Sequence, residues 1–275
     1  MLMDISQLTA DSVALVGVPS DENSSFMRGP ALAPGRIREA LHCGSANMTT
    51  ERGVDLGTNG RWHDVGDMVL GVGEAAFDDI TAQMGAILAQ GGKVLALGGD
   101  HAVTYPIVRA YAARYPRLTI VHLDAHPDLY DELDGNGRSH ACPFARIMEN
   151  GLAQRLVQIG IRTMNAHQRA QAERFGVEVI EAWTVGWETA VSLTFDTPVY
   201  LSLDLDVLDP AFAPGVSHHE PGGLTTRQLL HLIQTLSANL VGADIVELNP
   251  HRDLVGMTAM VAAKCTKELL ARLLD

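Results

Sequence analysis

Short apolar runs alternate with longer amphipathic stretches along almost the whole chain, and this alternation constrains the fold more than any other feature. The short runs are rich in Val, Ile and Leu and are bounded by Gly, Asp or Pro, which is typical of buried strands. They span residues 12–18, 93–97, 118–123, 156–161, 199–203 and 241–246. The stretches between them predict helices over residues 34–41, 74–90, 103–113, 165–175, 226–237 and 256–274. Such alternation indicates an α/β protein with a mainly parallel sheet and helices on both faces.

The length and composition favour one large domain over residues 1–275. A chain of 275 residues with 47% apolar residues can bury a full hydrophobic core without disulfide or metal crosslinks. With only 19% charged residues, the composition excludes a disordered chain. No internal repeat, low-complexity segment or linker-like change in composition divides the sequence.

Charge and cysteine content exclude several classes of protein. The net charge of −13 argues against nucleic acid as a partner, because a phosphate backbone requires clustered Lys and Arg. Three widely separated cysteines, Cys43, Cys142 and Cys265, indicate neither a disulfide framework nor a zinc ribbon. No apolar run approaches the roughly 20 residues that span a bilayer, and the first 20 residues do not resemble a targeting peptide. We therefore expect a cytoplasmic protein without a membrane partner.

Acids and histidines follow three of the predicted strands. Alternate residues of an extended segment share a face, so the run LTIVHLDAHPD presents three ligand-type side chains on one side. YLSLDLDVLDP repeats the pattern, and LALGGDH adds a histidine behind a pair of glycines. The residues concerned are Asp124, His126 and Asp128, Asp204 and Asp206, and His101. All three segments fall at the carboxyl edge of a parallel sheet, where α/β folds bind their ligands.

Four carboxylates and two imidazoles without a thiolate favour Mn²⁺ or Mg²⁺ over zinc, and the imidazoles favour a transition metal. Six ligands suit two ions that share bridging carboxylates, and such a pair can activate a bridging hydroxide for hydrolysis. Four carboxylates, two divalent ions and a bridging hydroxide together leave about one negative charge, to which Glu247, after the last predicted strand, adds another. This charge favours a cationic substrate such as a guanidinium group and disfavours a phosphate ester.

The same motifs, GGDH, DAHPD and SLDLDVLDP, resemble the three metal-binding signatures of the ureohydrolase superfamily, which includes arginases, agmatinases, guanidinobutyrases and formimidoylglutamases. The likeness covers nearly the whole chain. In particular, GVPSDENSSFMRGPALAPGRIREAL, SHACPFARIMENG, DPAFAPGVSHHEPGGL and GADIVELNPHRDLVGMTAMVAAK look like plant-type arginases. The resemblance implies a three-layer α/β/α sandwich, assembled as a homotrimer or homohexamer.

The resemblance also implies a binuclear manganese centre, with two Mn²⁺ per chain. One ion would be held by His101, Asp124, Asp128 and Asp204, and the other by Asp124, His126, Asp204 and Asp206, so that Asp124 and Asp204 bridge. The resemblance further implies that His140 relays protons, that Glu247 binds the guanidinium group, and that Asp206 passes a proton to the leaving nitrogen. The implied reaction hydrolyses L-arginine to ornithine and urea.

The substrate's tail is less well defined by the sequence. Asn136 and Ser139 lie in the loop that reaches the substrate's carboxylate end in arginases, and Arg138 between them is a candidate cation for that carboxylate. Thr163 and Asn165 stand where animal-type arginases carry acidic residues, one of which helps to hold the substrate's α-amino group, so Asn165 is a candidate substrate-binding residue. Plant-type arginases also resemble Asn here, so arginine is not excluded, but the case against agmatine is weaker.

Three alternatives to an arginase remain open: an agmatinase or another guanidino-compound hydrolase, a two-metal phosphoesterase, and a non-enzymatic metal-loaded relative. The last would require the loss of His140 or Glu247, and both are present. His218 and His219 are either solvated loop residues or part of the pocket mouth.

Overall fold

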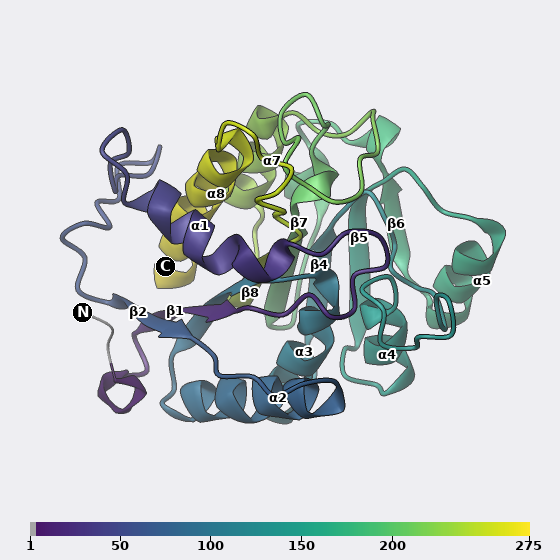
Figure 1. Cartoon of the computed structure of the whole chain (residues 1–275), viewed down its shortest axis with the longest axis horizontal. Helices are drawn as coiled ribbons and strands as arrows, with labels where there is room; N and C mark the ends of the chain where they lie inside the picture. Colours follow the sequence, from purple (N-terminus) through teal and green to yellow (C-terminus); the bar gives the residue numbers. More distant parts are fainter. Residues whose placement is uncertain (1–3) are drawn as a thin grey trace.

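A parallel sheet of eight strands runs through the centre of the computed structural model, which describes residues 4–275 (Figure 1). Across the sheet the order is β2-β1-β3-β8-β7-β4-β5-β6, and all neighbouring strands are parallel. The strands are β1 (Val13–Val18), β2 (Trp62–Asp67), β3 (Lys93–Gly98), β4 (Thr119–Leu123), β5 (Arg155–Ile161), β6 (Glu178–Glu181), β7 (Val199–Asp204) and β8 (Leu240–Val246). The predicted α/β class with a parallel sheet is confirmed.

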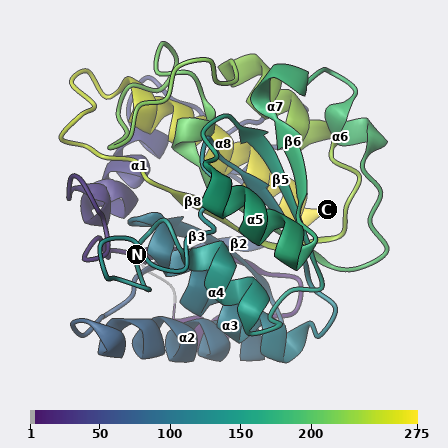
Figure 2. The ribbon, with the colours of Figure 1, turned by 90° about the vertical axis from the view of Figure 1, so that its right-hand side faces the viewer.

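Helices cover both faces of the sheet and complete the three layers (Figures 1 and 2). One face carries α1 (Ala33–Leu41), α6 (Thr189–Ser192), α7 (Thr226–Thr235) and α8 (Met257–Leu274), which contact one another in the pairs α1–α8, α7–α8 and α6–α7. The other carries α2 (Glu74–Ala89), α3 (Thr104–Arg114), α4 (Pro143–Glu149) and α5 (Ala166–Phe175). Short 3₁₀ turns are η1 (Ile5–Gln7), η2 (Pro30–Leu32), η3 (His101–Val103), η4 (Ala182–Thr184) and η5 (Leu205–Val207).

The strands divide their side chains between two hydrophobic cores. In β1, Val13 and Leu15 belong to the core beneath α1 and α8, whereas Ala14 and Val16 belong to the core beneath α2 and α3. Successive side chains of a strand point to opposite faces, so a strand that is covered on both sides is apolar at most positions. This is why the central strands are continuous apolar runs in the sequence.

Two strands and two helices were not predicted from the sequence. β2 (WHDVGD) and β6 (EVIE) are the two edge strands of the sheet, and most of their residues are only half-buried. An edge strand has less apolar surface to bury, so it lacks the run of Val, Ile and Leu that marks the central strands. The two helices, α4 and α6, are short, with seven and four residues.

The strand order brings four segments that are distant in the sequence to the middle of one edge. β3 and β4 are consecutive along the chain but are separated in the sheet by β8 and β7. This is where the winding of the chain reverses, and α/β sheets bind ligands at such points. No helix within residues 4–275 is both long enough and apolar enough to cross a membrane. That residues 1–275 form one domain stays a prediction, and residues 1–3 lie outside the described part.

Candidate active site

The six predicted metal ligands lie at the carboxyl ends of β3, β4 and β7. His101 begins η3 directly after β3, and Asp206 lies in η5 directly after β7. Asp124 follows β4, and its carboxylate is fully buried. The list of ligand-type residues near these strand ends is completed by His126, Asp128 and Asp204. The structure therefore brings together the residues that the three motifs contribute.

A first group of atoms surrounds the ring of His101. Its Nδ1 lies 3.1 Å from Asp124 Oδ2, 3.1 Å from Asp128 Oδ2 and 3.2 Å from Asp204 Oδ2. The nitrogen is buried and makes no hydrogen bond with any of these oxygens. One nitrogen and three carboxylate oxygens facing one another in this way form the donor set of a cation site.

A second group lies beside the first and shares Asp124 with it. His126 Nδ1 is 2.9 Å from Asp206 Oδ2 and 3.5 Å from Asp124 Oδ1. Asp124 thus directs one oxygen to each group, as a bridging carboxylate does. Asp204 differs from Asp124 in the use of its two oxygens. Its Oδ2 faces the first group, whereas its Oδ1 accepts a hydrogen bond from the backbone N–H of Asp206 at 2.8 Å.

The pKa shifts in this cluster indicate that added positive charge would stabilise its carboxylates. Burial raises the pKa of Asp204 well above its usual range, and the neighbouring Asp206 and Asp124 raise it further. Burial and the charge of Asp124 likewise raise the pKa of Asp206 to about 6. Burial alone would lower the pKa of His126, but the charges of Asp206 and Asp124 outweigh burial and raise this pKa to about 12. Because four carboxylates and two imidazoles are held so closely, the residues fit a pair of divalent metal ions.

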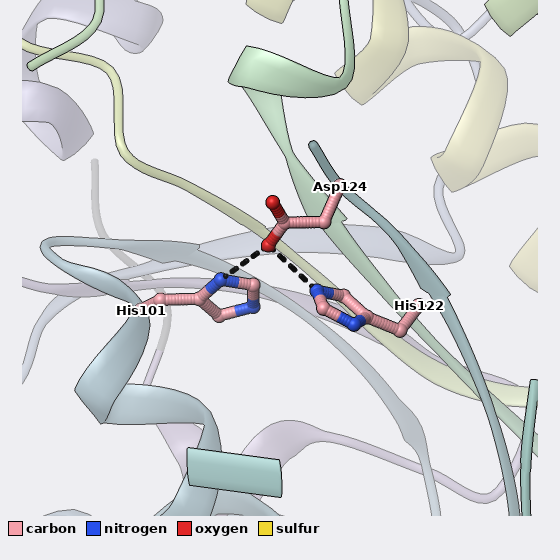
Figure 3. Close-up of side chains that lie close together, drawn as sticks. All are labelled: His101, His122 and Asp124. Atoms are coloured by element: carbon pink, nitrogen blue, oxygen red, sulfur yellow. Dashed lines mark hydrogen bonds and ion pairs between the residues drawn. The ribbon is translucent and has the colours of Figure 1, made fainter. Parts of the chain in front are cut away.

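A second layer of buried polar groups lies behind these ligands. The Nε2 atom of His101 is 3.0 Å from Ser202 Oγ, and that hydroxyl donates to Asp244 Oδ1 at 2.7 Å. His122, near the end of β4, is hydrogen-bonded to Asp124 (Figure 3). Burial lowers the pKa of the His122 ring. The sequence analysis missed His122, although a histidine within an otherwise apolar strand was a signal.

Glu247 and His140 form an ion pair beside the cluster. Glu247 follows β8 and has a φ of 66°, and its Oε1 accepts from the backbone N–H of His101 at 2.9 Å. His140 Nδ1 lies 2.7 Å from the same oxygen, and its Nε2 lies 2.9 Å from Ser25 Oγ. Burial alone would lower the pKa of His140, but the charge of Glu247 outweighs burial and raises this pKa to about 9. Glu247 Oε2 is buried and has no hydrogen-bond partner, so it is available to a ligand.

A pocket of about 160 Å³ opens above these groups. It is lined by residues of the cluster and also by Tyr130, Leu133, Thr163 and Gln168. Two loops that stand out in the sequence for their polar composition, residues 21–30 and 131–140, contribute Ser25, Leu133 and His140 to the wall.

Of the two adjacent histidines His218 and His219, only His218 lines the pocket. His218 lines the wall, with its ring centroid 5.0 Å from that of His140. His219 is bonded instead to the carbonyl of Pro214 at 2.7 Å and to Arg252 at 3.2 Å.

The residues predicted to bind the substrate's tail have other partners, and none of them lines the pocket. Asn136 donates to Asn23 at 3.1 Å, which joins the two polar loops. Ser139 is buried. Asn165 caps α5 and donates to the hydroxyl of Tyr130 at 2.7 Å. A substrate contact by Asn136, Ser139 or Asn165 stays a prediction.

Arg138, the candidate cation for the substrate's carboxylate, does not line the pocket either. Its guanidinium group pairs with Glu74 at 3.1 Å and lies over the rings of Tyr105 and Phe77, at 5.0 and 5.4 Å from their centroids. These contacts direct the charge toward α2 and α3. Among residues 4–275, no lysine or arginine lines the pocket.

Comparison with known proteins agrees with this geometry. A model of the arginase family matches residues 11–271. The chain is 48% identical to arginase 1 of Arabidopsis thaliana, with 95% of this chain and 81% of the relative covered. It is 32% identical to an agmatinase of Bacillus cereus, over 94% of this chain and 90% of the relative. Among solved structures, an arginase from Medicago truncatula has a TM-score of 0.90 and 42% identity, over 96% of this chain and 88% of that one.

The comparison corrects one expectation. The names of the plant arginases that the chain matches place those proteins in mitochondria or chloroplasts. The cytoplasmic location expected from the sequence is contradicted by these relatives, because composition does not record where a folded enzyme works.

Proposed function

The chain belongs to the arginase family and is a hydrolase that acts on a guanidino group, and we propose that it converts L-arginine to ornithine and urea. The observation that carries the proposal is the position of Glu247. Its Oε2 atom is buried, unpaired and beside a cluster of ligand-type residues. A buried carboxylate oxygen needs a donor, and the N–H groups of a guanidinium ion are charged donors.

We further propose that two Mn²⁺ ions occupy the cluster. His101, Asp128, Asp124 and Asp204 would hold the first, and Asp124, His126, Asp204 and Asp206 the second. The mixture of carboxylates and imidazoles supports this choice of metal. Bound there, the ions would lower the pKa of a water molecule and so make it a nucleophile near neutral pH. Metal analysis of the purified protein checks the assignment: close to two manganese equivalents are expected, and a single zinc ion with full activity would contradict it.

The protein's own residues orient the substrate and move protons. Glu247 accepts from the guanidinium N–H groups through Oε2, while its Oε1 stays bonded to His140. His140 connects Glu247 to Ser25 at the pocket wall, so it can pass a proton between the reacting nitrogen and the opening. Asp206 would hold the proton that the leaving nitrogen receives.

Agmatine is the second candidate substrate, and one observation favours it. The described part of the pocket has no lysine or arginine side chain to pair with the carboxylate of arginine, since Arg138 is bonded to Glu74. Donors such as the hydroxyl of Tyr130 would have to bind that carboxylate instead. The higher identity to plant arginases than to an agmatinase supports arginine.

One experiment separates the two substrates. The values of kcat/KM for arginine, agmatine and guanidinobutyrate are compared at equal manganese loading, with urea release as the readout. A preference for arginine supports the proposal, and a preference for agmatine replaces the substrate without changing the chemistry. We also propose a homotrimer or homohexamer, which light scattering coupled to gel filtration tests directly.

A further inference from the structure

His122 lies directly behind Asp124, the carboxylate shared by both ligand groups (Figure 3). The ring is fully buried in β4, and its Nε2 atom is 2.7 Å from Asp124 Oδ2. It stacks on Phe144, with ring centroids 3.8 Å apart and planes at 26°. His122 therefore cannot turn its Nε2 atom away from Asp124 without breaking this packing.

Gln158, on the neighbouring strand β5, determines which nitrogen of His122 carries the proton. Its Nε2 atom lies 2.6 Å from the carbonyl oxygen of Pro127 and 3.0 Å from His122 Nδ1. A carbonyl oxygen only accepts, so the amide must present its NH₂ group to Pro127. The second N–H then donates to His122 Nδ1, which must be unprotonated. The neutral ring carries its proton on Nε2 and donates it to Asp124.

His122 could also be considered as a metal ligand, but the position of its proton excludes this. Ligand atoms of His101, His122 and Asp124 lie within 4.8 Å of one another, close enough for one metal ion. A metal ligand must offer a lone pair, however, and the Nε2 lone pair of His122 is used by its proton. The other nitrogen faces Gln158 rather than the cluster.

We propose that His122 binds no metal and is a positioning residue: together with Gln158 it holds the carboxylate of Asp124 in the orientation that serves both ligand groups. The inference rests on the proposed metal centre. Hydrogen bonds of this kind, one layer behind the ligands, orient a ligand before the metal arrives. Their loss typically weakens metal binding by roughly 10- to 100-fold.

The test compares manganese affinity in three variants and the wild type by competition with a chelator. His122→Phe keeps an aromatic ring against Phe144 but removes the N–H group, and we expect binding roughly 10- to 100-fold weaker. Gln158→Leu leaves His122 in place as a donor to Asp124 but removes the N–H group that keeps Nδ1 unprotonated. We therefore expect a smaller loss of manganese affinity. Gln171→Leu is the matched control, because Gln171 is also a buried glutamine that donates to the same loop, at the carbonyl of Leu129, without contacting His122. It should bind manganese as the wild type does.

A spectroscopic measurement on the metal-free protein tests the protonation state without activity or metal. In protein with ¹⁵N-labelled histidine, the resonances missing from His122→Phe identify this ring among the 11 histidines. We expect the wild-type ring to be neutral with its proton on Nε2, and Gln158→Leu to shift part of the population to Nδ1. This readout would not move if His122 only filled space.

The outcomes distinguish this inference from the proposed function. If the wild type binds manganese and folded His122→Phe binds it within twofold, the positioning role is wrong while the metal centre stands. A wild-type ring protonated on Nδ1 also overturns the role, because Nε2 would then be free to bind metal. If the wild type binds no divalent metal, the proposed centre fails and the inference fails with it.

Discussion

Two residues of the candidate site have backbone conformations that side chains rarely adopt. Asp128 has a φ of 49° and Glu247 a φ of 66°, and only one other residue in the described range that is not glycine, Asp134, has a positive φ. Such conformations cost of order 1–3 kcal/mol each and persist where the surroundings impose them. Here they direct two carboxylates into the pocket at strand ends, so part of the folding energy is used to hold the site in place.

Glu247→Gln tests the guanidinium contact. Glutamine keeps the shape of the side chain but removes its charge, so the substrate cation loses its buried partner. Loss of one member of such a pair costs about 2–5 kcal/mol, and we expect kcat/KM for every guanidino substrate to fall by roughly 30-fold or more. Metal content should stay unchanged, since Glu247 is not among the proposed ligands. Urea release at the wild-type rate, with the metal content unchanged, would contradict the role.

His140→Asn tests the proton relay. Asparagine can still bond to Glu247 but cannot carry a proton between it and Ser25. General acid–base groups typically contribute 10²–10⁴-fold, so we expect kcat to fall by about 100-fold or more, with both metals retained. Partial recovery on adding imidazole would support the relay. Loss of one manganese equivalent would show instead that His140 is a ligand.

At the scale of whole elements, the central strands were predictable and the sheet edges were not. A strand covered on both faces is marked by its continuous apolar run, whereas β2 and β6 pack on fewer neighbours and keep polar residues. That the candidate metal ligands converge on one edge of the sheet was predictable, because they follow recognisable strands. The contact between Ser25 and His140 was not predictable, because the two residues are 115 positions apart in the sequence and only the folded loops bring them together.

Asn165 shows how a residue predicted for a ligand contact is also part of a helix. Its side chain accepts from the backbone N–H of Gln168 and forms a capping box at the start of α5. We expect Asn165→Ala to lower the free energy of unfolding by about 1 kcal/mol, and Asn165→Asp, which keeps an acceptor, to retain the wild-type value. Denaturant unfolding measures both. An unchanged stability together with a raised KM for arginine would assign Asn165 to the substrate rather than to the helix.

Glu51 connects the loop after α1 to α7 and α8, and it predicts a dependence of stability on pH. Hydrogen bonds from Arg227 and Gln234 lower the pKa of Glu51 to about 2. Because the folded-state pKa is below the usual glutamate value of 4.5, the contribution of Glu51 to stability is fully present above pH 4.5 and disappears as the pH falls toward 2. Glu51 and Arg227 are both partly exposed, so solvent screening limits their contribution to the free energy of unfolding to about 1 kcal/mol or less. Glu51→Gln should therefore be less stable than the wild type at pH 7, and the gap should narrow below pH 4.5. A gap that stays constant from pH 7 to 3.5 would refute the assignment.

At the scale of the whole molecule, a cluster of like charges is buried in the middle of the central sheet. The four carboxylates of the candidate metal centre are buried at the ends of adjacent central strands, β4 and β7, next to two further strands of the same sheet. Burying like charges raises the free energy of the folded state unless cations compensate them. The stability of the sheet and the occupancy of the cluster should therefore be linked.

Metal removal tests this link. A ligand that binds only the folded state stabilises it by about 2.7 kcal/mol at a free concentration 100 times its Kd. For a chain of this size, each kcal/mol corresponds to roughly 2–4 °C in Tm. We therefore expect a chelator to lower the Tm by roughly 5–10 °C, and added manganese to restore it in proportion to the logarithm of its concentration. Glu247→Gln is the matched control, because it lies beside the cluster and should show the full shift, whereas Asp124→Asn should show little or none. An unchanged Tm in protein shown to have lost its metal would mean that the sheet tolerates these buried carboxylates without cations.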